Sequence, residues 1–225
     1  MAIRPRAGLT HLRPTTKGAF ALNPPRRAVK RGMAKLYFHF STMNAGKSTV
    51  LLQAAHNYAE RGMETYLLTA KLDDRAGQGR IASRIGIGKE ADTYSRDSDL
   101  YAMIADRLAA GPCACVFIDE AQFLTKAQVW DLARVVDDLG VPVMCYGLRV
   151  DFQGELFPGS AALLAWSDEM REIRTICHCG KKATMVVRQG PDGKALKEGA
   201  QVQVGGNETY VSLCRRHFRE AIGDL

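Results

Sequence analysis

The segment "STMNAGKST" (41–49) carries a lysine and hydroxyl side chains at the spacing of a phosphate-binding loop. Backbone N–H groups of residues 43–48 would point inward around a di- or triphosphate, and the positive end of a following helix would add to the attraction. In such a loop Lys47 reaches the β- and γ-phosphates and Ser48 holds Mg²⁺. Gly46 leaves room, because a β-carbon would crowd the phosphate.

The loop departs from the usual motif at its first position, where Ser41 stands in place of glycine. A small residue can make this turn if its backbone does not need a positive φ. The alternative is a chance match to the pentapeptide "AGKST". The apolar stretch before the loop and the amphipathic stretch after it favour the nucleotide site over that alternative.

A second group of polar residues ends the apolar stretch "VFIDEAQF" (116–123). Asp119 would bind Mg²⁺ directly or through water, and Glu120 would take a proton from an attacking hydroxyl. That hydroxyl belongs to water in an ATPase and to a substrate alcohol in a kinase. The alternative is a pair of acids favoured by the dipole of a helix N-terminus. In "LDDR" (72–75), Arg75 could pair with Glu120 or a phosphate, or belong to a solvated loop.

Three cysteines and one histidine have the spacing of a metal site, as Cys177-x-Cys179 and Cys214-x-x-His217. Three thiolates and an imidazole suit a closed, tetrahedral, structural Zn²⁺ site. Zinc would tie together a region too small to be held by its own core. Reduced thiols with a surface histidine are the alternative, and His178 could compete as a ligand. The remaining cysteines fall in expected strands and are interpreted as core: Cys113, Cys115 and Cys145.

Strands and helices are expected to alternate along the first part of the chain. Apolar runs predict strands at 35–40, 65–70, 113–119 and 141–148, and helical spacing predicts helices at 47–61, 98–110 and 126–139. Residues 71–90, rich in glycine and charge, are expected to form a long, mobile loop. This pattern predicts a mostly parallel α/β sheet with helices on both faces. Ligands of such sheets bind at the carboxyl ends of the strands, here the loops after Phe40, Ala70, Ile118 and Gly147.

The pattern changes after residue 172. The strand-like segments "KKATMVVRQ" (181–189) and "AQVQVGG" (200–206) flank a polar stretch, which predicts a hairpin with a long loop. We therefore expect a P-loop α/β domain at 33–172 and a small zinc-binding domain at 173–225.

The net charge of +7 comes from the first 32 residues, which hold eight basic side chains and no acidic one. Without them the chain holds 23 basic and 24 acidic residues, so its body has no charge bias toward nucleic acid or membranes. Three interpretations of 1–32 stay open: a start assigned too early, with Met33 as the true start, a disordered basic arm, or an organelle transit peptide. Six cysteines without a secretory signal predict a reducing, cytoplasmic location.

Five motifs in this order resemble the type II thymidine kinases, and their bacterial branch most closely: "STMNAGKST", "FIDEAQFL", "CYGLRVDFQGELFPGS", "TICHCGKKAT" and "GGNETYVSLCRRH". The likeness runs from about residue 34 to 222. It implies transfer of the γ-phosphoryl of Mg-ATP to the 5′-hydroxyl of thymidine, with deoxyuridine also accepted. It further implies a RecA-like P-loop domain, a small zinc-binding domain and a homotetramer. In that branch a serine opens the phosphate loop, as Ser41 does here.

The resemblance also assigns residues. Glu120 matches the catalytic base, and Cys177, Cys179, Cys214 and His217 match the zinc ligands. The matches to the ATP site are Ser41, Thr42, Met43, Asn44, Ala45, Gly46, Lys47, Ser48, Asp119, Glu120, Ala121 and Gln122. The family grips its base largely with main-chain groups of the loop at 202–210. The matches around the nucleoside are Met43, Phe123, Leu148, Phe152, Val202, Gln203, Val204, Gly205 and Tyr210.

The residues are also compatible with two other functions. One is a P-loop ATPase that binds nucleic acid through a zinc ribbon, for which Lys181, Lys182, Arg215 and Arg216 offer a modest basic group. The other is a kinase for a different nucleoside. Phe123 and Phe152 have flat faces that suit stacking on a pyrimidine, but ordinary core positions are an equally good interpretation.

Overall fold

The computed structural model describes residues 34–72, 77, 79–201 and 209–223. All elements below belong to the compact unit Gly32–Leu225. Several predictions therefore lie outside the described residues, namely those on the basic tail 1–32, on Arg75 and on Val202, Gln203, Val204 and Gly205.

The centre of the molecule is a six-stranded sheet with the order β5-β2-β6-β7-β1-β8, in which every neighbouring pair is parallel. Four strands are the predicted ones: β1 (Leu36–Ser41), β2 (Thr65–Ala70), β6 (Cys115–Ile118) and β7 (Val143–Leu148). Their apolar sequences reflect burial on both faces of the sheet. Two short strands form the edges, β5 (Asp92–Tyr94) and β8 (Glu169–Glu172).

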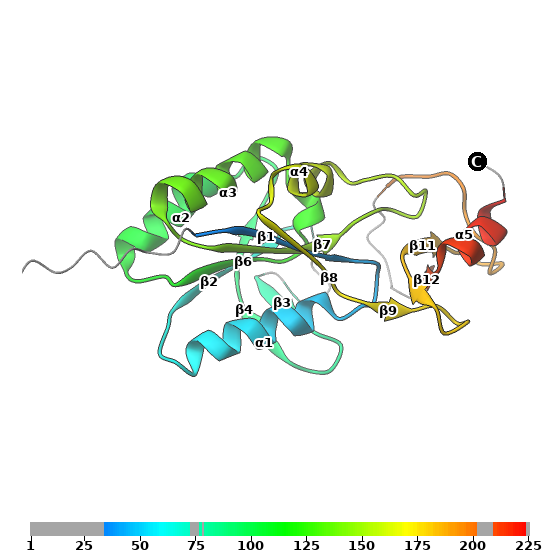
Figure 1. The fold of residues 1–225 in the computed structure, drawn as a ribbon, viewed down its shortest axis with the longest axis horizontal. Coiled ribbons are helices and arrows are strands. Elements are labelled where there is room, and N and C mark those ends of the chain that lie inside the picture. The colour runs from blue at the N-terminus through cyan, green and yellow to red at the C-terminus, as the bar shows by residue number, and fades with distance from the viewer. Residues whose placement is uncertain (1–33, 73–76, 78, 202–208, 224–225) are drawn as a thin grey trace, which may run out of the picture. The chain divides into compact units, whose positions relative to one another are not determined.

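Helices cover both faces, as predicted. In Figure 1, α2 (Leu100–Ala110), α3 (Lys126–Leu139) and α4 (Pro158–Trp166) lie on one side of the sheet and α1 (Lys47–Ala59) lies on the other. Sequence-encoded caps fix their ends: Thr125 and Gln128 form a capping box at the start of α3, and Gly140 ends it with a φ of 67°. No helix among the described residues is both long and apolar enough to cross a membrane.

The prediction of a loop over 71–90 is wrong for its second half. Residues 80–90 form an antiparallel hairpin of β3 (Arg80–Ala82) and β4 (Gly88–Glu90). Ile81 is buried with Leu51, Leu52 and Ala55 of α1, so one apolar side chain anchors the hairpin on that helix. Strands of three residues are too short for an alternating pattern to reveal them.

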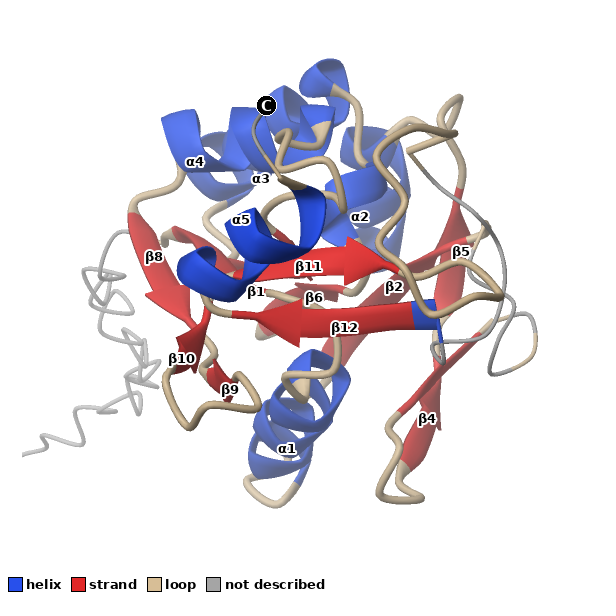
Figure 2. Cartoon of the chain, turned by 90° about the vertical axis from the view of Figure 1, so that its right-hand side faces the viewer, coloured by secondary structure: helices blue, strands red, loops and turns tan. Residues whose placement is uncertain are grey.

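The C-terminal region builds two small antiparallel pairs, β9 (Thr175–Ile176) with β10 (Lys182–Ala183), and β11 (Met185–Arg188) with β12 (Tyr210–Leu213). The first predicted strand of the hairpin is confirmed in β11. Among the described residues its partner is β12, and most of the predicted segment "AQVQVGG" lies outside them. Figure 2 shows α5 (Arg215–Ile222) beside this pair. The shared core includes Val187, Leu213 and Phe218. The domain boundary at residue 172 stays a prediction.

Candidate active site

The loop after β1 has the geometry of a phosphate-binding loop. Positive φ angles occur at Asn44 (60°) and Gly46 (85°), after which α1 begins at Lys47. Ser41 has no positive φ and is buried, so the substitution for glycine at this position is accommodated. Lack of space does not require glycine at position 46, because none of the described residues beyond its chain neighbours lies within 4 Å of a β-carbon built there. Glycine is favoured there by its positive φ.

The loop and the acidic pair meet through two side chains of α1. Ser48 Oγ donates a hydrogen bond of 3.0 Å to Asp119 Oδ2, which joins the start of α1 to the end of β6. Lys47 is buried, and its Nζ donates to the Thr42 carbonyl at 3.3 Å. A hydroxyl beside a carboxylate is the oxygen-donor set that Mg²⁺ prefers. Both predicted magnesium ligands therefore lie together.

Asp119 is held in an environment that opposes its charge. Burial raises the pKa of its carboxyl group, and the neighbouring Glu120 carboxylate raises it further, whereas Lys47 and the Ser48 hydroxyl lower it. The backbone N–H of Glu120 donates to Asp119 Oδ1 at 3.0 Å. A cation bound beside Asp119 would therefore relieve a real electrostatic cost.

Glu120 stands in a strained and well-supported position. Its φ of 52° is in the left-handed region, which non-glycine residues rarely adopt. Gln122 donates from Nε2 to Glu120 Oε2, and its Oε1 accepts from the Leu148 N–H at 3.0 Å. The Tyr94 hydroxyl on β5 donates to the Glu120 carbonyl at 3.0 Å and lies 3.2 Å from that of Asp119. Gln122 therefore holds the Glu120 carboxylate directly, and Tyr94 holds the backbone of Asp119 and Glu120.

A cavity of about 440 Å³ brings these groups together. It is lined by the phosphate loop, by the acidic pair and by the β3–β4 hairpin: Met43, Asn44, Gly46, Lys47, Ser48, Thr49, Arg80, Ile81, Ala82, Ser83, Arg84, Ile85, Asp119 and Glu120. No sequence motif predicted the hairpin wall or the contact of Tyr94. Thr49 Oγ1 donates to Ser83 Oγ at 2.9 Å, and this bond fastens the hairpin turn to α1.

The predicted nucleoside residues that the structure describes come from separate segments of the chain, which include the phosphate loop, the end of β7 and the start of β12. Ser212 Oγ on β12 donates to the Met43 carbonyl at 2.7 Å, which ties the strand of Tyr210 to the phosphate loop. Leu148 ends β7 in the pair with Ser41. Met43 lines the cavity, whereas the other four predicted nucleoside residues that the structure describes are not among its lining residues: Phe123, Leu148, Phe152 and Tyr210.

The two predicted stacking phenylalanines differ in their surroundings. Phe123 is half-buried against the main core and meets Phe157 edge to face. Phe152 is buried, and the Arg188 guanidinium lies 3.9 Å from its ring centroid. Arg188 also donates to the Ala200 carbonyl at 2.9 Å. A core role and a nucleoside role for these rings both stay predictions.

The predicted zinc ligands form one cluster, with the ligand atoms of Cys177, Cys179, Cys214 and His217 all within 4.8 Å of one another. Cys179 Sγ and Cys214 Sγ are 3.9 Å apart, close to the roughly 3.7 Å expected for two thiolates on one tetrahedral zinc. His217 offers Nδ1, 3.2 Å from Cys177 Sγ, and its Nε2 faces Glu220 Oε2 at 3.6 Å.

The pKa of Cys177 also fits a metal site. Burial opposes its ionisation, but backbone N–H groups of Cys179 and Cys214 and the His217 side chain outweigh this and lower the pKa of the thiol to about 6. His178, the predicted competitor, is not part of the cluster. The donor set and its spacing fit a structural Zn²⁺ ion.

Comparison with known proteins agrees with this geometry. The profile of a family described as thymidine kinase matches residues 34–218. The chain belongs to the thymidine kinase family. A thymidine kinase of Jannaschia sp. (strain CCS1) is 75% identical over 193 residues, which cover 86% of this chain and 99% of that protein.

More distant relatives carry the same description. A thymidine kinase of Rhizobium meliloti (strain 1021) is 66% identical over 189 residues, 83% of this chain and 96% of the relative. One of Pasteurella multocida (strain Pm70) is 56% identical over 190 residues, 84% of this chain and 99% of the relative. The family match begins at residue 34 and ends at residue 218, so it covers the described elements up to the first half of α5 and none of the basic tail.

Proposed function

We propose that this protein transfers the γ-phosphoryl group of ATP to the 5′-hydroxyl of thymidine, giving dTMP and ADP, and that it also accepts deoxyuridine. Membership of the thymidine kinase family supports the substrate. The observation that carries the chemistry is the shared cavity, which Glu120 lines together with the phosphate loop and Lys47.

The residues divide the work of an in-line transfer. The 5′-oxygen attacks the γ-phosphorus, the bond from that phosphorus to the β-phosphate oxygen breaks, and Glu120 accepts the proton of the hydroxyl. Lys47 and the loop amides hold the phosphates, and Ser48 and Asp119 would hold Mg²⁺. When bound, Mg²⁺ neutralises charge on the β- and γ-phosphate oxygens. Gln122 and Tyr94 keep the Glu120 carboxylate oriented before substrate arrives.

Zinc would serve structure and not chemistry. Its four ligands come from both ends of the 177–217 region, and they lie next to β12, whose Ser212 contacts the phosphate loop. We further propose a homotetramer, supported by the family resemblance and by exposed apolar residues such as Trp130, which is 55% exposed. We also propose a reducing, cytoplasmic location, in which the zinc thiolates would persist.

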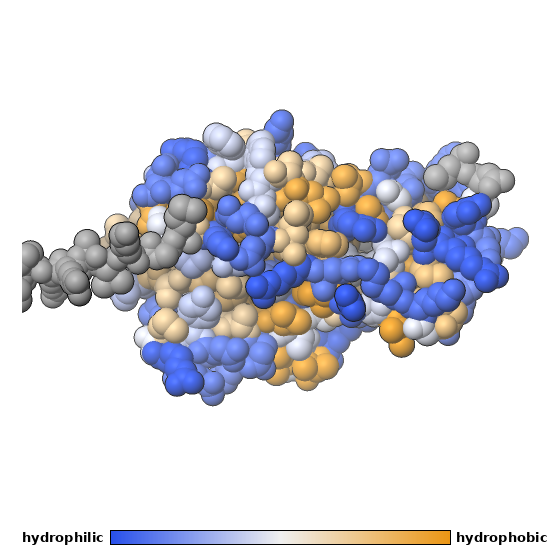
Figure 3. Space-filling view, in the orientation of Figure 1, coloured by the Kyte–Doolittle hydropathy of each residue, from blue (hydrophilic) through white to orange (hydrophobic). Residues whose placement is uncertain are grey.

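A nucleic-acid-dependent ATPase is not favoured. In Figure 3 hydrophilic side chains cover much of the end of the molecule that carries α5. Basic and acidic residues occur together in this region. Arg216 pairs with Glu220 at 2.8 Å and Lys182 pairs with Glu172 at 2.6 Å. The other two basic residues of this group, Lys181 and Arg215, are close in sequence to the cysteines of the cluster. Their positive charges would balance the negative charge of thiolates bound to zinc.

The test is an acceptor comparison with purified protein and Mg-ATP. We expect dTMP and ADP in equal amounts with thymidine, less product with deoxyuridine, and little ADP with purine nucleosides or single-stranded DNA. ADP release stimulated only by DNA would overturn the proposal in favour of the ATPase. Transfer to a different nucleoside alone would keep the kinase mechanism and replace the substrate.

A further inference from the structure

The β3–β4 hairpin forms a wall of the active-site cavity that no motif had indicated. One apolar contact and one hydrogen bond hold the hairpin there. Ile81 is 1% exposed and packs on α1, and Ser83 Oγ accepts a hydrogen bond from Thr49, two residues after Lys47. The hairpin turn is therefore placed by the same helix that begins at the phosphate loop.

The cavity needs more positive charge than the phosphate loop supplies. Two adjacent carboxylates, Asp119 and Glu120, face the space that a triphosphate would occupy. The cations that line the cavity among the described residues are Lys47, Arg80 and Arg84. In phosphoryl transfer, negative charge spreads over the γ-phosphate oxygens in the transition state, and a guanidinium fork matches those oxygens.

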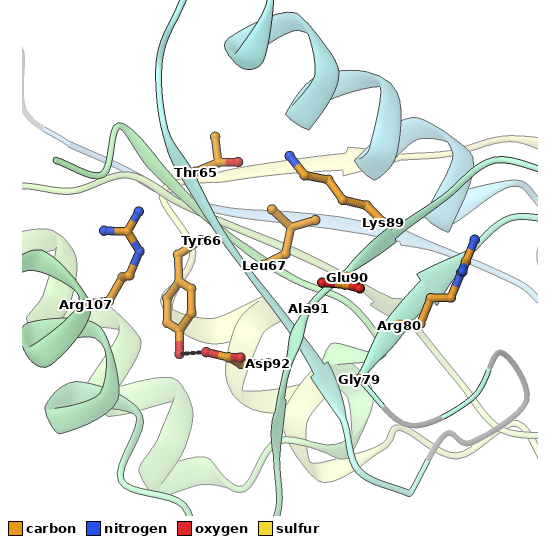
Figure 4. Close-up of a pocket in the computed structure, with 10 residues that line it drawn as sticks. All are labelled: Thr65, Tyr66, Leu67, Gly79, Arg80, Lys89, Glu90, Ala91, Asp92 and Arg107. Atoms are coloured by element: carbon orange, nitrogen blue, oxygen red, sulfur yellow. Dashed lines mark hydrogen bonds between the residues drawn. The ribbon is translucent and has the colours of Figure 1, made fainter. Parts of the chain in front are cut away.

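The two arginines differ in how they are held. The Arg80 guanidinium lies against Gly88 across the hairpin, so close that a β-carbon there would be 2.9 Å from its nitrogens. Arg80 also lines a second pocket, together with Lys89 and Glu90 (Figure 4). Arg84 is exposed at the turn and lines the catalytic cavity but not the second pocket. It makes no hydrogen bond or ion pair with other described residues.

We infer that Arg84 is a catalytic residue whose guanidinium contacts the transferring phosphoryl group. This inference rests on the proposed kinase function. Arg84 takes no part in bond exchange and accepts no proton. It binds the equatorial oxygens as the γ-phosphorus moves from the β-phosphate oxygen to the 5′-oxygen, and this contact is stronger in the transition state than with ground-state ATP.

The hairpin offers a matched control for this role. Lys89 on β4 carries the same charge but lines only the second pocket, together with Thr65, Tyr66 and Asp92 (Figure 4). Replacing Lys89 removes one positive charge from the same hairpin without touching the catalytic cavity. A general electrostatic or folding effect of the hairpin would appear in both variants, whereas a contact with the phosphoryl group would appear only at residue 84.

The experiment compares Arg84→Gln, Arg84→Lys and Lys89→Gln in steady-state assays with thymidine and Mg-ATP. For Arg84→Gln we expect kcat to fall at least about 100-fold with both KM values within threefold, because an arginine of this kind is worth about 10³–10⁵ in rate at the upper end. Arg84→Lys should recover only part of the loss, because an ammonium lacks the planar fork. Lys89→Gln should stay within twofold of the wild type.

A binding measurement gives a second readout. The affinity for ADP, aluminium fluoride and thymidine together should fall at least about 50-fold in Arg84→Gln, whereas the affinity for ATP alone should change less than threefold. Melting temperatures of the three variants should match the wild type, because Arg84 and Lys89 are exposed.

Three results would overturn the inference: near wild-type kcat in Arg84→Gln, equal losses in Arg84→Gln and Lys89→Gln, or a loss confined to KM. A parallel variant, Arg75→Gln, tests the arginine that the sequence singled out. Loss of kcat there with full activity in Arg84→Gln would also overturn it.

Failure of the proposed function looks different, because the wild type itself would then form no dTMP. The same variants could then be compared with whichever acceptor the protein uses.

Discussion

His39 should make the stability of this protein depend on pH. It lies on β1, is 8% exposed, and stacks on Tyr146 with ring centroids 4.5 Å apart. Its Nδ1 is buried with no hydrogen-bond partner among the described residues. Burial, and secondarily the charge of Arg171, lower the pKa of His39 from 6.5 to about 4, while Glu169 raises it slightly.

The sign and size of the effect follow from that pKa. A lowered pKa means that the unfolded chain binds the proton more tightly, so the free energy of unfolding is highest above pH 6.5 and falls as the pH drops toward 4. The shift of His39 from 6.5 to about 4 corresponds to about 3.4 kcal/mol in full. Between pH 7 and pH 5 the expected loss is about 2 kcal/mol.

The assay is urea unfolding followed by tryptophan fluorescence at pH 7, 6 and 5, at one protein concentration. His39→Phe keeps a ring against Tyr146 and cannot titrate, so it should lose about 2 kcal/mol less than the wild type over this range. Protonation of the zinc ligands affects both proteins equally and cancels in this difference.

The exposed His56 on α1 provides the control, and His56→Gln should keep the wild-type pH dependence. His39→Gln serves if the phenylalanine variant folds poorly. The same pH dependence in the His39 variants as in the wild type would refute the reasoning.

Two further predictions concern the supports of the site. Gln122→Leu leaves the buried Leu148 N–H without its acceptor and should cost about 1–3 kcal/mol in unfolding free energy and at least tenfold in kcat. Gln153→Leu, which removes an exposed bond to a carbonyl, is the control in the same thermal unfolding and kinetic assays, and an equal effect of both variants would count against the positioning role. Cys179→Ser should lower bound zinc well below one ion per chain and reduce the melting temperature, whereas Cys113→Ser should retain zinc. Full zinc content in Cys179→Ser would remove that thiol from the site.

The catalytic edge of the sheet was predictable because its signals are local. Four apolar runs, each followed by a polar loop, determine the parallel strands, and the carboxyl ends of parallel strands must meet at one edge. Ser48 and Asp119 were therefore expected to lie together, and the hydrogen bond between them shows that they do. The zinc cluster was predictable for a similar reason, since three cysteines and one histidine in two short, closely spaced pairs suit a structural zinc site.

Other parts depend on contacts that no local pattern contains. The β3–β4 hairpin is held by Ile81 on α1 and by a bond between Thr49 and Ser83, 34 residues apart. Gln122 can hold the Glu120 carboxylate because β7 ends beside the residues that follow β6. This arrangement brings the Leu148 N–H to the Gln122 side chain. The pairing of β11 with β12 joins residues 185–188 to residues 210–213 across a long intervening segment, which no local pattern contains.

The central claim is that Glu120 takes the proton of the attacking hydroxyl in the cavity of the phosphate loop. Its most direct test is Glu120→Gln, in which the amide oxygen can still accept from Gln122 and the fold should be retained. We expect wild-type dissociation constants for ATP and thymidine with kcat reduced about 10²–10⁴-fold. Wild-type turnover with both substrates bound normally would contradict the claim.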